Sequence, residues 1–286
     1  MADAGGWSTI ESDEGLFTSL IETLGVKDTQ FEELISLDAD TIRSLGSVYG
    51  VIFLFKWTRE TTTAHTSAPL DGTYDQTAPD NLFFAAQTIQ NACGTQAILS
   101  VILNHDNPPA PTPPIPLGDE LRSFKDFTTG FPPELRGEAL SNSEAIRSAH
   151  NSFARASPFA DETARPQDDE KGADVYHFIA YTPVNGTLYE LDGLQPYPIS
   201  HGECGMGEFP EKVIEVLQRR IARYPPEETH FNLMAVWENT LRRHNFVGFI
   251  GEVMKGVVGS KEKDGGYEEW VEGAKRETRK KLEMRR

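Results

Sequence analysis

The sequence predicts an α/β protein with helices and strands packed in layers, and three segments carry this prediction. Residues 48–57 form a long β-branched and aromatic run that suits a buried strand. Asn185-Gly186 lies between two alternating apolar runs, which is the strongest short-range signal for a β-hairpin. Residues 93–103 are apolar over a length typical of a helix. Because each element must bury its apolar face against another, this mixture favours a layered domain.

The remaining elements follow from apolar spacing and from residues that favour turns. Helices are expected around residues 16–24 and at residues 93–103, 118–129, 141–155 and 209–224. Strands are expected at residues 48–57, 81–87, 175–182, 187–192 and 231–237. Ser141 or Asn142 is expected to cap the helix at 141–155. The Thr-, Pro-, Asp- and Gly-rich residues 62–80 and the six prolines within 106–117 predict loops.

Two segments depart from this pattern. Residues 156–174 contain six acidic residues and no periodic apolar face, which predicts a long loop that is either functional or disordered.

The main domain is expected to span residues 1–237, and residues 238–286 are expected to form a helical C-terminal extension. Apolar side chains recur there at three- and four-residue steps, from Phe246 to Val257. This extension is too short for a core of its own, so it should pack on the domain, on another copy or on a partner.

Composition restricts the function classes. The net charge of −17 argues against nucleic-acid binding, which requires a basic surface, and favours steering of a basic protein partner. No stretch approaches the ~18 apolar residues of a membrane span, and the N-terminus has no basic, apolar lead, so neither a membrane segment nor a secretory signal is expected. Two cysteines, Cys93 and Cys204, are better explained as free thiols in a reducing compartment than as a disulfide framework.

Cys93 is the first candidate for catalysis. It lies between an expected strand and the first turn of an apolar helix, where free amides and the helix dipole lower a thiol's pKa. The same terminus offers the Cys93 backbone N–H as a donor to an oxyanion. A second donor must come from a nearby side chain, and spacing alone does not choose among four candidates. These candidates are Gln87, Gln90, Asn91 and Gln96. The alternative is a buried core cysteine.

His177 and Asp192 form the second candidate constellation. A two-residue turn at 185–186 pairs positions whose numbers sum to 371, so His177 faces Leu194 and Asp192 is its diagonal neighbour. A carboxylate on one ring nitrogen fixes the tautomer and leaves the other nitrogen to exchange a proton with a thiol. The alternatives are a surface histidine and an aspartate that merely begins a turn. No spacing fits a metal site or a phosphate loop, so neither metal nor cofactor is expected.

Together these segments resemble the ubiquitin C-terminal hydrolase family over residues 6–237. The matching motifs are Trp7-Ser-Thr-Ile-Glu-Ser-Asp, Gly50-Val-Ile-Phe-Leu-Phe-Lys-Trp57, Gln87…Asn91-Ala-Cys93-Gly-Thr, Leu140-Ser-Asn-Ser143, His150-Asn-Ser-Phe153 and His177…Leu191-Asp192-Gly193. The resemblance implies that Cys93 is the nucleophile, His177 the general base and acid, and Asp192 the orienting carboxylate. It also selects Gln87, six residues before the cysteine, as the side-chain oxyanion donor.

The resemblance further implies a papain-like α/β/α fold with a mostly antiparallel central sheet and a knotted backbone. Residues 156–174 would be a crossover loop above the active site. The implied activity is cleavage after the last glycine of ubiquitin, through a thioester and without a cofactor. The alternatives are a non-catalytic ubiquitin-binding scaffold and a protease for another ubiquitin-like modifier.

Four segments look most like the proteasome-associated branch of the family: the opening Trp7 motif, Asn151-Ser-Phe-Ala-Arg155, Phe231-Asn-Leu-Met-Ala and Arg243-His-Asn-Phe-Val-Gly-Phe-Ile250. Members of that branch bind the proteasome's ubiquitin receptor through a helical C-terminal extension, which implies a cytoplasmic and nuclear protein. In this chain the extension departs from the pattern, because the long helical stretch before Arg243 is nearly absent.

Overall fold

A computed structural model describes residues 6–57, 68–89, 91–153 and 176–239 of the chain. The backbone divides into two units, residues 1–239 and 240–286, and the second lies outside the described residues. The expected crossover loop at 156–174 and the extension beyond residue 239 therefore also lie outside them. The expected knot depends on the path of the crossover loop and stays a prediction.

Seven strands and seven α-helices form the described part of the chain. The strands are β1 Thr29–Glu33, β2 Val48–Lys56, β3 Thr73–Tyr74, β4 Tyr176–Val184, β5 Thr187–Leu191, β6 Ile199–Glu203 and β7 Asn232–Glu238. The helices are α1 Glu14–Thr23, α2 Ala39–Ser44, α3 Cys93–Ile102, α4 Asp119–Thr128, α5 Pro133–Asn142, α6 Glu144–Ser152 and α7 Phe209–Ile221, with a short 3₁₀ turn at Ala78–Asp80.

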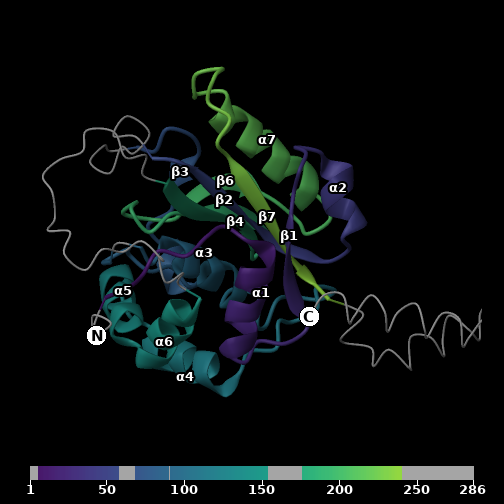
Figure 1. Ribbon diagram of the computed structural model, residues 1–286. Helices are drawn as coiled ribbons and strands as arrows, with labels where there is room; N and C mark the ends of the chain where they lie inside the picture. The colour runs from purple at the N-terminus through teal and green to yellow at the C-terminus, as the bar shows by residue number, and fades with distance from the viewer. Residues whose placement is uncertain (1–5, 58–67, 90, 154–175, 240–286) are drawn as a thin grey trace, which may run out of the picture. The chain divides into compact units, whose positions relative to one another are not determined.

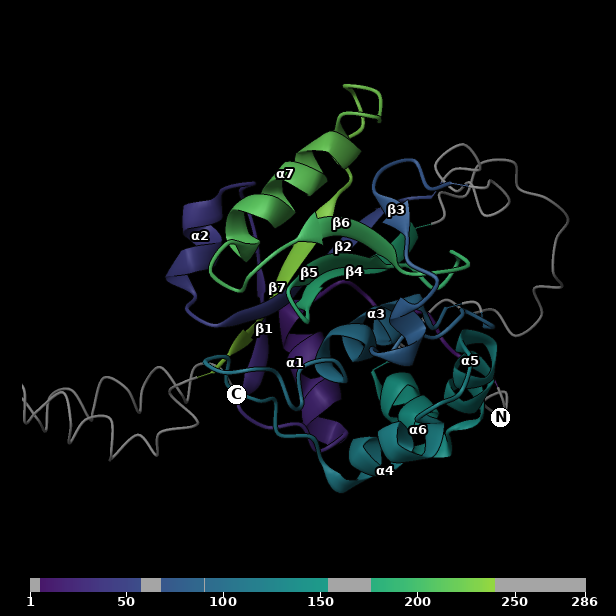
Figure 2. The same cartoon turned by 180° about the vertical axis from the view of Figure 1, so that it is seen from behind.

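The strands form one antiparallel sheet in the order β1-β7-β2-β4-β5-β6-β3. Helices α2 and α7 cover one face of this sheet, and α1, α3, α4, α5 and α6 lie on the other (Figures 1 and 2). One hydrophobic core fills the space between the sheet and α2 and α7, and a larger one lies on the opposite face. The expected α/β/α layering is thus confirmed.

Strand β2 shows how the sequence places the centre of the sheet. It pairs with β7 on one side and β4 on the other, and its residues are buried on both faces, as its continuous apolar run predicts. At Gly50, an added Cβ would lie 2.8 Å from the carbonyl oxygen of Tyr181 and 3.0 Å from Val101 of α3. The missing side chain therefore allows α3 to approach the sheet closely.

The β4–β5 hairpin has the expected register. Ala180 pairs with Leu191 and Tyr181 with Glu190, and Asn185 and Gly186 both adopt the positive φ that a tight hairpin turn requires. The ladder ends at Leu191, however, so the expected pairing of His177 with residue 194 does not occur. Asp192 has already left the strand and begins a turn closed by the Gln195 N–H on its carbonyl oxygen.

Two further expectations were wrong. Residues 81–87 join no strand, because residues 81 and 82 lie in a turn and the backbone groups of residues 83–87 form hydrogen bonds with side chains and loops. Ser141 and Asn142 end helix α5, and the cap of α6 is Ser143, whose hydroxyl accepts the Ile146 N–H. Helix α5 was not expected because its apolar residues form no stripe. Its buried Arg136 guanidinium donates to the Leu82 and Pro79 carbonyls, and Gly137 allows a close approach, because an added Cβ would lie 2.1 Å from the Ala86 carbonyl oxygen.

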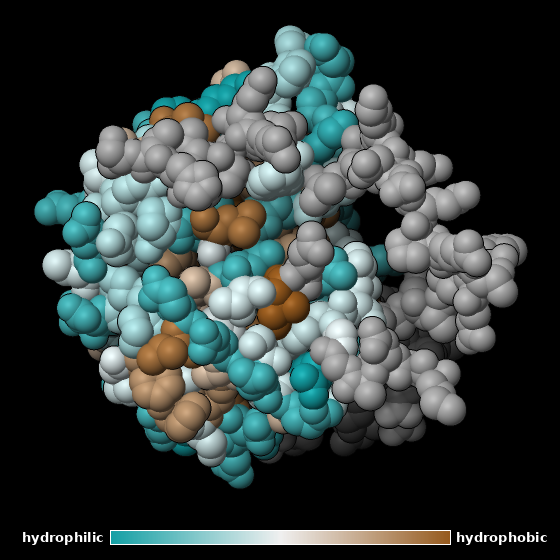
Figure 3. Space-filling model, turned by 90° about the vertical axis from the view of Figure 1, so that its left-hand side faces the viewer, coloured by the Kyte–Doolittle hydropathy of each residue, from teal (hydrophilic) through white to brown (hydrophobic). Residues whose placement is uncertain are grey.

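Most of the described surface on the face in Figure 3 is hydrophilic or neutral, with apolar groups gathered in small areas. Within the described residues, no helix is long and apolar enough to cross a bilayer.

Candidate active site

Cys93 is the first residue of α3, and its side chain is partly exposed. The first amide groups of a helix have no partner within the helix, so the Cys93 and Gly94 N–H groups face outward from the helix start. The thiol contacts the His177 ring and the backbone N–H groups of Phe178 and Gly94. The nucleophile candidate therefore lies where helix α3 meets the start of strand β4.

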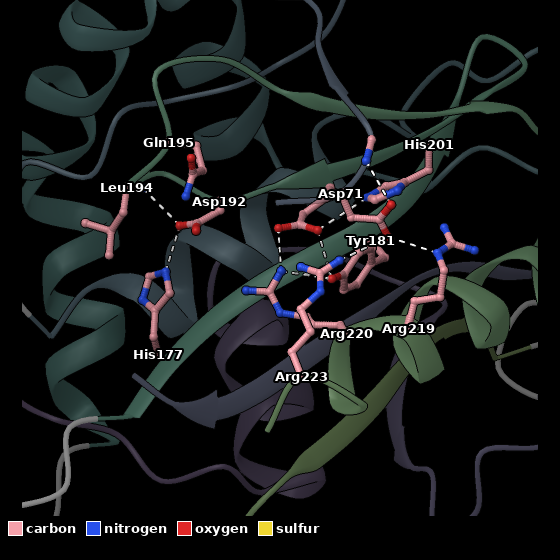
Figure 4. A network of polar contacts seen from close by, with 12 residues as sticks. Asp71, His177, Tyr181, Asp192, Leu194, Gln195, His201, Arg219, Arg220 and Arg223 are labelled. Carbon is pink, nitrogen blue, oxygen red and sulfur yellow. Dashed lines mark hydrogen bonds and ion pairs between the residues drawn. The ribbon is translucent and has the colours of Figure 1, made fainter. Parts of the chain in front are cut away.

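His177 and Asp192 are brought together by the strand and by the turn after its partner strand. The Nε2–H of His177 donates to Asp192 Oδ1 at 2.7 Å, and both side chains are buried (Figure 4). The same oxygen accepts the Leu194 N–H at 3.0 Å, which fixes the carboxylate within its own turn. Because Asp192 occupies Nε2, the nitrogen left for the Cys93 thiol is Nδ1.

Cys93, His177 and Asp192 shift one another's protonation equilibria toward the charged forms of Cys93 and His177. Burial raises the pKa of the Cys93 thiol, but the hydrogen bond and charge of His177 and the Phe178 and Gly94 amides together lower it below its usual value. Burial lowers the pKa of His177, but the Asp192 carboxylate and the contact with Cys93 outweigh it and raise that pKa to about 9. The arrangement favours a thiolate beside an imidazolium, and the two groups titrate as a pair.

The hydrogen bonds of the structure distinguish among the four candidate oxyanion donors. Gln96 donates its amide to the Ala85 carbonyl at 2.5 Å, and Asn91 donates to the Trp7 carbonyl at 3.2 Å. Gln90 lies outside the described residues. Gln87 is half-buried, and it is the one described candidate whose side-chain amide makes no hydrogen bond with the described residues, so both of its N–H donors are available.

A buried polar network lies next to the histidine (Figure 4). Glu190 accepts hydrogen bonds from Arg220 at 2.6 Å and from the Tyr181 hydroxyl at 2.9 Å. Burial raises the pKa of Glu190, but the Arg220 charge outweighs it and lowers that pKa to about 2. The Arg220 guanidinium lies 4.5 Å from the centre of the Phe55 ring, which in turn contacts the His177 ring edge-on at 5.7 Å. The network therefore contacts the imidazole through the Phe55 ring.

A second histidine, His150, links the N-terminal residues around Ser8 to helix α3 through hydrogen bonds. His150 Nε2 lies 2.6 Å from the Ser8 carbonyl oxygen, which can only accept, so Nε2 carries the proton. Its Nδ1 accepts the Thr95 hydroxyl at 2.7 Å, and burial lowers the pKa of His150 so that the ring stays neutral. Thr95 follows Cys93 by two residues. The residues around Ser8 are thus held close to the start of the nucleophile helix.

Comparisons with known proteins agree with this geometry. The profile of the family described as ubiquitin carboxyl-terminal hydrolase, family 1, matches residues 7–222. Ubiquitin carboxyl-terminal hydrolase 2 of Schizosaccharomyces pombe is 49% identical, with 88% of this chain and 91% of that protein covered. The chain belongs to the ubiquitin carboxyl-terminal hydrolase family. A further relative, isozyme L5 of Dictyostelium discoideum, is 44% identical over 84% of this chain and 64% of its own length.

Solved structures also resemble this ubiquitin carboxyl-terminal hydrolase. The catalytic domain of Trichinella spiralis UCH37 bound to ubiquitin vinyl methyl ester is 37% identical, with a TM-score of 0.67 over 82% of this chain and 97% of that one. UCH37 from the same organism, also bound to ubiquitin vinyl methyl ester, is 35% identical with a TM-score of 0.67 over 95% of this chain and 98% of that one. The fold class and the family resemblance expected from the sequence are both confirmed.

The hydrolase fold brings Cys93, His177 and Asp192 together. It also places Gln87 against the turn that follows Asp192, because the Gln87 N–H donates to the Gly193 carbonyl at 2.8 Å. Gly193 has no predicted role beyond its place in the Leu191-Asp192-Gly193 motif. An added Cβ there would lie 2.1 Å from the Gln96 amide nitrogen and 3.0 Å from Gln87, so the glycine is needed for close contact. Among the described residues, no group of three or more His, Cys, Asp or Glu side chains is placed to hold a metal ion.

Proposed function

We propose that the chain is a cysteine-type deubiquitinase that hydrolyses the bond after the C-terminal glycine of ubiquitin. The observation that carries this proposal is the buried Asp192–His177 pair in contact with a thiol at a helix start, in a chain of this family. Two similar solved proteins are bound to ubiquitin vinyl methyl ester, a ubiquitin carrying an electrophile at its C-terminus.

The reaction begins with attack of the Cys93 thiolate on the carbonyl carbon of that glycine. The negative charge that develops on the oxygen is stabilised by the Cys93 N–H and the Gln87 amide. His177, protonated at Nδ1, gives its proton to the leaving amine, and a thioester remains. His177 then takes a proton from water, and the hydroxide attacks the thioester. The thiolate is released, and Asp192 stabilises the imidazolium at both stages.

Release of a fluorophore from the C-terminus of ubiquitin tests this proposal directly. We expect turnover by the purified chain and covalent labelling of Cys93 by a ubiquitin-based electrophile. A chain that binds ubiquitin without turnover would be a scaffold rather than an enzyme. Stronger labelling by an electrophile built on another ubiquitin-like modifier would instead identify a different substrate.

Replacing Gln87 by alanine is expected to lower kcat by about 10²–10³-fold, because the transition state loses one oxyanion donor. KM should change little, since the ground-state carbonyl does not yet carry the charge. Steady-state hydrolysis of the ubiquitin–fluorophore substrate measures both constants. An unchanged kcat would show that the second donor is another group, such as Gln90.

We also propose that residues 238–286 bind the proteasome's ubiquitin receptor and that the enzyme acts in the cytoplasm and nucleus. The support is the Arg243–Ile250 segment, which is similar to the proteasome-associated branch, and a basic final stretch in an otherwise acidic chain.

Deleting residues 240–286 is expected to abolish capture of the chain by the purified receptor, while ubiquitin–fluorophore hydrolysis is retained. Imaging of the tagged full chain tests the proposed location. Equal receptor capture with and without the extension would disprove the proposed role of residues 238–286, and exclusion from the cytoplasm and nucleus would disprove the location.

A further inference from the structure

Gln96 occupies an unusual place for a polar side chain. It is 6% exposed and lies one helical turn after Cys93, so the two residues are neighbours on the surface of α3. Its amide leaves the helix and donates to the Ala85 carbonyl at 2.5 Å. Ala85 precedes Gln87 by two residues, so this bond links the helix of the nucleophile to the segment of the oxyanion donor.

The segment that carries Gln87 has no strand partner to fix its position. Its far end is fastened just beyond α3, where Asn104 accepts the Phe83 N–H at 2.7 Å and donates to the Phe83 carbonyl at 2.9 Å. Gln96 makes the corresponding bond near the start of the same helix. Asn104 and Gln96 thus hold the segment beside α3, the buried Arg136 guanidinium donates to the Leu82 and Phe84 carbonyls, and Gln96 is the nearer of the two α3-side residues to Cys93.

The same amide also bounds the turn that follows the catalytic aspartate. The Gln87 N–H donates to the Gly193 carbonyl, and an added Cβ at Gly193 would strike the Gln96 amide nitrogen at 2.1 Å. On the other side, the Ala86 N–H donates to the Pro133 carbonyl at 2.9 Å. The buried side-chain amide of Gln96 therefore lies where helix α3, the segment that carries Gln87 and the turn after Asp192 come together.

We propose that Gln96 is a positioning residue that sets the place of the Gln87 oxyanion donor relative to the Cys93 sulfur, an inference that rests on the deubiquitinase function proposed above. Loss of the Gln96 amide would remove one of the three hydrogen bonds at the near end of the segment and leave those of the Ala86 and Gln87 N–H groups, while Asn104 keeps the far end in place. Gln87 would then shift from the developing oxyanion without any change in the pairing of Cys93 with His177. Small displacements of this kind are known to be costly for catalysis, at about 10²-fold for roughly 1 Å.

The test replaces Gln96 by leucine, which has similar bulk and no donor, and measures ubiquitin–fluorophore hydrolysis. We expect kcat to fall about 10-fold to 10²-fold, with KM changed by less than about twofold, because the affected interaction forms only in the transition state. Ser100→Ala is the matched control, since it removes a buried hydroxyl that bonds only within α3, to the Gln96 carbonyl. That control should retain the wild-type kcat.

A double-mutant cycle separates positioning from a general structural role. In a Gln87→Ala background, Gln96→Leu should have little further effect, because the donor that it positions is already gone. Alkylation of Cys93 by iodoacetamide, measured against pH in a Cys204→Ala background, should be the same with and without Gln96→Leu, since alkylation forms no oxyanion.

Three results would overturn the proposal: a loss no larger than that of Ser100→Ala, a full loss in the Gln87→Ala background, or a shifted alkylation profile. Gln96→Met serves if the leucine variant does not fold, and failure of both to fold would assign Gln96 to the fold alone. Absence of turnover in the unmodified chain would instead reject the deubiquitinase function itself.

Discussion

Cys93→Ala is expected to reduce ubiquitin–fluorophore hydrolysis by about 10⁴–10⁶-fold, to the level of background. Without the thiol no thioester forms, and the remaining donors cannot replace covalent catalysis. Binding of ubiquitin should persist, because the substitution removes one small, partly exposed group and leaves both hydrophobic cores intact. Hydrolysis and ubiquitin affinity, measured on the same preparation, check both parts.

Cys204 supplies the matched control for this substitution. It is buried, and burial raises the pKa of its thiol to about 11, so it is protonated and unreactive at neutral pH. Cys204→Ala should therefore leave both turnover and labelling by the ubiquitin electrophile unchanged. Labelling that survives Cys93→Ala but is lost in Cys204→Ala would mean that the nucleophile has been assigned to the wrong thiol.

Asp192→Ala is expected to lower kcat by about 10²–10⁴-fold, because the imidazole loses both its orientation and the charge that stabilises its protonated form. Asp192→Asn separates the two effects. The asparagine oxygen can still accept from His177 Nε2–H and from the Leu194 N–H, so orientation is kept while the charge is lost. We expect a smaller loss of kcat for the asparagine variant than for alanine.

The same pair of variants predicts a change with pH. His177 has a pKa of about 9 in the folded chain, against an ordinary value of 6.5, so its imidazolium protonates the leaving amine up to mildly alkaline pH. The stability that this raised pKa contributes is fully present below about 6.5 and is lost as pH rises through about 9. In Asp192→Asn, the alkaline limbs of the kcat profile and of the stability profile should both move to lower pH. If the alkaline limbs of both profiles stay at the wild-type pH, Asp192 does not set the pKa of His177.

Much of the catalytic site was predictable because its signals are local. An Asn-Gly turn fixes the register of its hairpin by backbone twist alone, and the observed pairing of Ala180 with Leu191 follows from it. A cysteine at the start of an apolar helix and a histidine and aspartate in one hairpin are likewise visible without tertiary contacts. The family motif adds the spacing between Gln87 and Cys93.

Other features depend on contacts between distant segments. Residues 81–87 have the composition of a strand, but Asn104, Gln96 and the Gly193 loop satisfy their backbone groups, so no ladder forms. Helix α5 lacks an apolar stripe and is held by its buried Arg136, which donates to the Leu82 and Pro79 carbonyls. Propensity describes a residue's preference on its own, and here the surrounding tertiary structure overrides it.

The sequence alone determined the family, the layered fold, the hairpin and the identities of Cys93, His177 and Asp192 as candidates. Only the tertiary structure decided which glutamine side chain is held by a backbone partner, because Gln96 and Gln87 are the same residue type near the same cysteine. The Gln96 amide is held by the Ala85 carbonyl, and the Gln87 amide makes no hydrogen bond with the described residues. The physical reason is that a side-chain donor becomes available or occupied through partners distant in sequence, and local spacing does not encode those partners.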